Sequence, residues 1–136
     1  MACCFIHCKN QNVKSIDQDH GSVCVKMILE KDSELGSKRN HDCESTSLSN
    51  TIDIYTQALS DLDFSDCPSS FSQAFQEHIN AWIEMKEVTD GYPDLRGEMH
   101  DLFDQIRQTK DSTQFKIRLN MIWSTWESIE KLSGQK

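Results

Sequence analysis

Apolar side chains recur at alternating steps of four and three residues in four stretches of this 136-residue chain. Because an α-helix turns once per about 3.6 residues, this spacing places each set of side chains on one side of a helix. Each apolar stripe needs the others for burial, so the sequence predicts an all-α fold: an antiparallel up-down bundle of three to four helices. The stripes consist of Leu48, Ile52, Tyr55, Leu59 and Leu62; Phe71, Phe75, His78, Trp82 and Met85; Leu95, Met99, Leu102 and Ile106; and Phe115, Leu119, Ile122, Trp126 and Ile129.

Capping and helix-breaking residues set the expected ends of these helices. Hydroxyl side chains at 45–49 cap a first helix that reaches about residue 63, and Pro68 starts a second that ends near residue 90. A third is expected from Asp94 to about residue 108, and a fourth from 111 or 112 to about 134. The expected core comprises Phe71, Phe75, Ile79, Trp82, Met99, Leu102, Phe103, Ile106, Phe115, Leu119, Ile122, Trp126 and Ile129.

The first 44 residues are polar and show no sustained periodicity. Such a segment has too few apolar side chains to offset the entropy of ordering its backbone. We therefore expect a mostly disordered N-terminal tail, with residues 9–44 as a flexible spacer before a helical domain at 45–136. Within the tail, only the segment 22–30 has enough apolar residues for a short strand or helical turn.

Five of the six cysteines lie in this tail, at positions 3, 4, 8, 24 and 43. Disulfide frameworks normally staple the region that carries the fold, so this distribution argues against one. Zinc sites usually combine two Cys or His knuckles, but only Cys4 and Cys8 have the required spacing. The sequence therefore predicts no metal site in the tail.

The first twelve residues have an apolar run that ends in cysteine and is followed by Lys9 and polar residues. This segment resembles the last third of a bacterial lipoprotein signal, in which a small residue precedes the lipid-bearing Cys. Ala2 before Cys3 matches the small residue, and the run before Cys8 matches the apolar part. The resemblance implies a truncated signal remnant at 1–8, with Cys3 or Cys8 as lipid anchor. Without an upstream signal, an ordinary cytoplasmic N-terminus is the alternative.

The net charge and the absence of known catalytic motifs argue against several classes of function. The net charge is −8 and no patch of Lys and Arg stands out, so nucleic acid is not expected as a partner. Catalytic motifs such as a nucleophile elbow, a phosphate-binding glycine loop or a His-Glu-x-x-His helix do not occur. No stretch approaches the roughly 18 apolar residues of a membrane-spanning helix, so membrane association would require the lipid anchor. We expect no catalytic site and no enzyme.

His78 is the one candidate ligand inside the expected bundle, because it falls on the apolar stripe of the second helix. Met99 and His100 on the third helix could supply an opposite ligand. In architecture and residue type this resembles the small four-helix b-type cytochromes, whose haem is held by a His and a Met. Haem or a metal ion on His78 is therefore the alternative to a protein without a cofactor.

A second candidate region follows the Gly-Tyr-Pro turn, where aromatic, acidic, basic and imidazole groups are close in sequence. Loops on a stable scaffold often carry recognition. The candidates for this interaction surface are Tyr92, Asp94, Arg96, Glu98 and His100. The sequence thus predicts a non-enzymatic acidic helical bundle that contacts an unknown protein partner at the cell envelope.

Overall fold

A computed structural model describes residues 2–134, and their side chains from residue 20 onward. Residues 2–134 contain helices and no strand, which confirms the all-α prediction. The helices are α1 (Ala2–Asp42), α2 (Leu48–Ser60), α3 (Ser69–Thr89), α4 (Met99–Arg107) and α5 (Ser112–Ser133).

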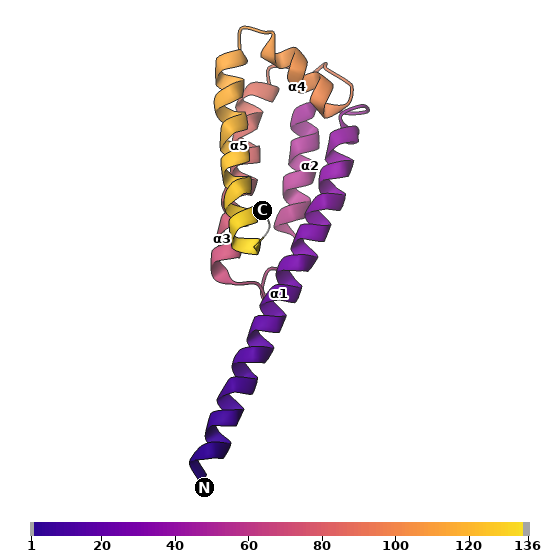
Figure 1. Cartoon of the computed structure of the whole chain (residues 1–136). Coiled ribbons are helices and arrows are strands. Elements are labelled where there is room, and N and C mark those ends of the chain that lie inside the picture. Colours follow the sequence, from indigo (N-terminus) through magenta and orange to yellow (C-terminus); the bar gives the residue numbers. More distant parts are fainter. Residues whose placement is uncertain (1, 135–136) are drawn as a thin grey trace.

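The helices α1, α2, α3 and α5 run side by side with alternating direction, and the short α4 lies at the end where α1 finishes (Figure 1). Packing is most extensive between α3 and α5, then between α2 and α3, while α4 contacts both α5 and α1. Five helices pack together, but the long helix beside α2 is α1, which the sequence did not predict, while the third predicted helix is the short α4 at one end. The N-terminal part of α1 extends past the bundle (Figure 1).

The third predicted helix begins later than expected, at Met99 instead of Asp94. Gly97 has a φ of 151°, a conformation that L side chains rarely adopt, so the chain cannot be helical there. Glu98 then caps α4, because its side chain accepts the backbone N–H of His100 at 2.9 Å. The loop is joined to α1 by a hydrogen bond from the Gly97 N–H to the Cys43 carbonyl, 3.1 Å long.

The core forms from the predicted stripes. All the expected core residues are buried except Leu119 and Trp126, which are half-buried on α5. Aromatic contacts connect the elements, with the Phe75 ring 5.2 Å from Phe71 and 5.6 Å from Phe64. The Phe103 ring lies 5.1 Å from Phe115 and joins α4 to α5.

The expectation of a disordered tail is wrong for residues 20–42, which form the bundled part of α1. The side chains that this helix turns inward follow a helical spacing, but several are not apolar, so a search for apolar stripes misses them. They are Cys24, Ile28, Asp32, Leu35, Arg39 and Cys43.

The cysteines also depart from the expectation, because Cys24 on α1 and Cys67 in the α2–α3 link form a disulfide. The Cα atoms are 5.1 Å apart across a sequence separation of 43 residues. Cys43 is a free thiol, buried at the end of α1. Burial raises the pKa of this thiol. Among the described residues, no helix has an apolar stretch long enough to span a bilayer.

Candidate functional site

A cleft of about 460 Å³ lies between α1 and α5, with α2 and α3 behind it and α4 at one end. The cleft forms because α1 and α5 stand at opposite edges of the helix array and do not pack tightly against each other. Its lining combines aromatic rings with a small number of charged groups. The lining residues are Asp32, Ser33, Gly36, Ser37, Arg39, Asn40, Tyr55, His78, Trp82, Met99, His100, Phe103, Asp104, Arg107, Leu119, Ile122, Trp123 and Trp126.

Arg39 is the charged group at the back of the cleft. Its guanidinium carbon lies 4.3 Å from the centre of the Trp82 ring and 4.6 Å from the centre of the Tyr55 ring. Asn40 Oδ1 accepts hydrogen bonds from Arg39 Nε and Nη2, at 3.3 and 3.0 Å. No carboxylate among residues 20–134 comes within ion-pair distance of this guanidinium. Two aromatic faces and one amide thus hold a cation that has no ionic partner.

Tyr55 and Asp32 form a buried polar pair next to Arg39. The Tyr55 hydroxyl donates a hydrogen bond to Asp32 Oδ1 and links α2 to α1. Burial raises the pKa of Asp32, while the hydrogen bond from Tyr55 and the charge of Arg39 oppose that rise. Burial also raises the pKa of Tyr55 far above its usual value. The pair keeps α1 against α2 along this wall of the cleft.

His78 projects from α3 and is 3% exposed. Its Nδ1 lies 2.8 Å from Thr125 Oγ1, and that hydroxyl in turn donates to the Met121 or Ile122 carbonyl, each at 3.0 Å. Because Thr125 has only one proton to donate, the His78 Nδ1–H is assigned as the donor to Thr125. Burial, aided by the charge of Arg39, lowers the pKa of His78 to about 4, so the ring is neutral at pH 7. Nε2 then carries the lone pair.

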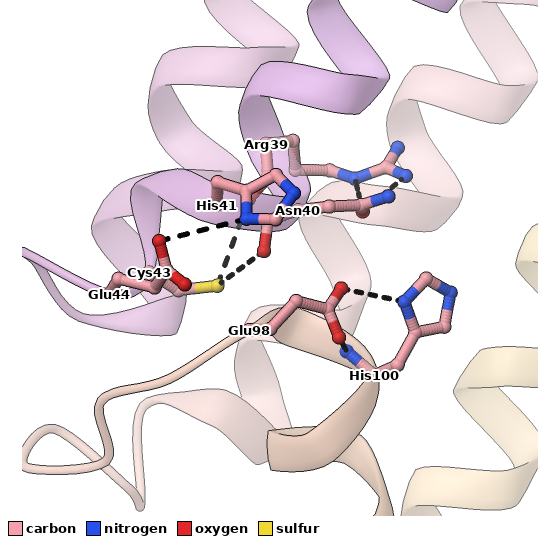
Figure 2. A network of polar contacts seen from close by, with 7 residues as sticks. All are labelled: Arg39, Asn40, His41, Cys43, Glu44, Glu98 and His100. Carbon is pink, nitrogen blue, oxygen red and sulfur yellow. Dashed lines mark hydrogen bonds and ion pairs between the residues drawn. The ribbon is translucent and has the colours of Figure 1, made fainter.

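At one end of the cleft, the last turns of α1 face the start of α4, and side chains in each segment make contacts within that segment. Figure 2 shows Arg39 and Asn40 on the last turns of α1, with Glu98 and His100 on the facing segment. Glu98 Oε1 lies 2.7 Å from His100 Nδ1, in addition to capping the helix. Cys43 directs its thiol back to the carbonyls of Arg39 and Asn40. The contact with Glu98 positions the His100 ring at the rim of the cleft.

The five residues of the predicted interaction surface make different contacts within the protein. The Tyr92 hydroxyl donates to Asp111, and Arg96 Nη1 donates to the Pro93 and Leu95 carbonyls at 2.8 Å. Asp94 is exposed, Glu98 caps α4, and only His100 reaches the cleft. Most of these side chains therefore form hydrogen bonds that stabilise the loop and the start of α4. The predicted lipid anchors Cys3 and Cys8 lie outside the residues whose side chains are described.

The predicted ligand set meets at the cleft, since His78, Met99 and His100 all line it. Side chains of His, Cys, Asp and Glu do not gather in threes as a metal site requires, in the part of the chain that the structure describes.

Sequence reasoning missed Arg39, Asp32 and Tyr55 as site residues. Asp32, Arg39 and Cys43 follow Ile28 at helical steps, and that spacing was the available signal.

No family model, no curated protein and no solved structure matches this chain. The cleft is therefore the feature of the molecule from which a function can be inferred.

Proposed function

We propose that this chain is a binding protein rather than an enzyme, and that the cleft between α1 and α5 holds a small organic molecule. The observation that carries the proposal is a partly open cleft with aromatic walls and a guanidinium that has no ionic partner. A folded protein normally pairs or solvates such a cation, so its presence in a cleft favours a ligand. Protein contact through the segment 92–101 stays a separate prediction.

Size and composition of the cleft support this function. Small-molecule sites usually measure about 300 to 1,000 Å³ and combine apolar walls with a few polar groups. The cleft of about 460 Å³ has that character, with Trp123 and Trp126 on α5 facing the polar residues of α1. Trp123 remains 58% exposed, an unusual state for an indole, and a bound planar molecule would cover it.

The disulfide supports a place of action outside the reducing cytoplasm. Stable disulfides form mainly in oxidising compartments such as the bacterial periplasm. The bridge between Cys24 and Cys67 therefore favours the cell envelope, in agreement with the lipoprotein-like start of the sequence. A lipid on Cys3 or Cys8 would then tether the protein.

The proposed function is tested with a neutral probe, N-phenyl-1-naphthylamine, whose fluorescence increases in apolar sites. Saturable binding of one probe per chain is expected. Ser33→Trp places a large side chain in the cleft and should abolish binding, whereas Glu34→Trp, at an exposed position outside the lining, should leave it unchanged. Equal binding by both variants would contradict the proposal, as would the absence of saturable binding of both this probe and a sulfonated dye of the same shape.

Haem on His78 is a second candidate, because the neutral Nε2 of a buried imidazole is the form that binds iron and this residue lines the cleft. Protein purified from its natural host, or titrated with haemin, would show a Soret band that His78→Ala removes. A titration without that band would eliminate this candidate.

A further inference from the structure

We propose that the cleft selects an organic anion, with Arg39 as the anchor for its carboxylate, sulfonate or similar group. This inference rests on the proposed function and adds the chemical class of the ligand. The apolar body of the ligand would lie against the indoles of α5, and its anionic end would reach the back of the cleft.

The orientation of the Arg39 guanidinium supports this assignment. The guanidinium carbon lies 4.3 Å from the centre of the Trp82 ring and 4.6 Å from the centre of the Tyr55 ring, and these two rings are nearly perpendicular to each other, so together they restrict the position of the group. Asn40 occupies the edge formed by Nε and Nη2. The other edge, formed by the two terminal nitrogens, can donate two parallel hydrogen bonds to a carboxylate or sulfonate.

Neighbouring charges leave Arg39 as the available cation. Arg107 also lines the cleft, but its Nη1 pairs with Asp104 at 2.9 Å and its guanidinium lies over Phe115. The Asp32 carboxylate receives the Tyr55 hydroxyl and does not reach Arg39 at ion-pair distance. The positive charge of Arg39 is therefore not cancelled by a direct partner.

The net charge of the whole protein affects how a preference of the cleft for anions can be interpreted. A net charge of −8 repels anions from the surface in general. Any preference for an anion over a neutral molecule of the same shape must therefore arise locally. A cleft with only apolar walls would show the opposite preference, because the anionic group would also lose its hydration.

Two dyes with the same aromatic body test the inference. 1-Anilinonaphthalene-8-sulfonate carries the anionic group that N-phenyl-1-naphthylamine lacks. The wild-type protein is expected to bind the sulfonate dye more tightly than the neutral dye. Arg39→Gln should weaken sulfonate binding about tenfold or more, the factor expected for a lost charge-assisted hydrogen bond, and change neutral-dye binding less than about twofold.

Lys38→Gln is the matched control, because it removes the same charge from the neighbouring position, which is exposed and lies outside the lining. It should leave the preference between the two dyes unchanged. Arg39→Lys keeps the charge but loses the planar edge, and should weaken sulfonate binding by an intermediate factor.

The outcomes separate the two proposals. If neither dye binds, the proposed function itself fails. If the neutral dye binds and the wild-type protein binds the sulfonate dye equally or more weakly, a ligand site exists but the anion inference is overturned. That arm uses only wild-type protein, so it decides the matter even if an Arg39 variant does not fold. Equal effects of Arg39→Gln and Lys38→Gln would also overturn the inference.

Discussion

The seam between α3 and α5 and the seam between α1 and its neighbours are built from different kinds of side chain. Between α3 and α5, the packing depends on apolar residues such as Phe75, Ile79 and Ile122. The contacts of α1 include the apolar side chain of Ile28, but also a disulfide, a buried tyrosine–aspartate pair and an arginine that lies over two aromatic rings. The first seam has a mainly apolar interior, although His78 and Thr125 form a hydrogen bond within it and Arg118 pairs with Glu84 and Glu87 across it. The second seam is a series of specific contacts.

This difference between the two seams explains where the cleft lies. An apolar seam gains free energy from closing completely, because every remaining gap leaves apolar area in water. The α1 seam is held by contacts at particular points, so α1 can stay against α2 without closing on α5. The cleft lies in the space between them, and its polar groups come mainly from α1. We expect single substitutions in the apolar seam to affect stability most, and the polar groups of the α1 seam to determine which ligand binds.

The largest effect is expected from Phe75→Ala in the apolar seam. Phe75 is fully buried, and its ring contacts Phe71, Phe64 and Trp126. Its truncation should lower the free energy of unfolding by about 3 to 5 kcal/mol, through lost burial and the cavity left behind. Urea unfolding followed by circular dichroism measures this loss. Ile83→Ala, exposed on the same helix, is the control and should change stability by less than about 1 kcal/mol.

Removal of the disulfide tests the α1 seam. The Cys24→Ser and Cys67→Ser double variant releases a loop closed across 43 residues, and loop entropy alone predicts a loss of up to about 4 kcal/mol. The same urea experiment measures it, and dithiothreitol should destabilise the wild-type protein but not the double variant. A wild-type protein indifferent to reductant would show that α1 is held by its other contacts.

Sequence reasoning identified α2, α3 and α5 because their buried positions are occupied by apolar side chains. It placed His78, Met99 and His100 as candidate ligands, and all three line the cleft. The α1 residues were missed because the buried Asp32 and the half-buried Arg39 are held inward by partners far along the chain, Tyr55 and Trp82. Helical periodicity does not reveal such pairing. The expected helix start at Asp94 was wrong because the backbone of Gly97 cannot be read from apolar spacing.

Acid should weaken the protein through His78, at the junction of the two seams. Its pKa is about 4 in the folded protein and about 6.5 when unfolded, so the unfolded chain binds the proton more readily. Stability from this residue is fully present above pH 6.5 and is lost as pH falls from 6.5 towards 4. The gap of about 2.5 pH units corresponds to roughly 3 kcal/mol.

Urea unfolding of the wild-type protein and His78→Gln, measured at intervals from pH 4 to 7, tests this. The variant should show a smaller fall in stability over that range than the wild type. Parallel pH profiles for the two proteins would show that His78 is not responsible for the acid sensitivity, and that the imidazole titrates alike in both states.

The smallest effect on stability is expected at Trp123, and comparison with Trp126 separates packing from binding on a single helix. Trp126 is half-buried, 5.4 Å from the His78 ring and 6.4 Å from Phe75, so Trp126→Ala should cost about 2 kcal/mol. Trp123 is mostly exposed and has no aromatic contact among the described residues, so Trp123→Ala should cost less than about 1 kcal/mol. Both line the cleft, so both should weaken binding of N-phenyl-1-naphthylamine. A Trp123→Ala variant with lowered stability and undiminished binding would instead assign this indole to the packed interior and remove Trp123 from the ligand site.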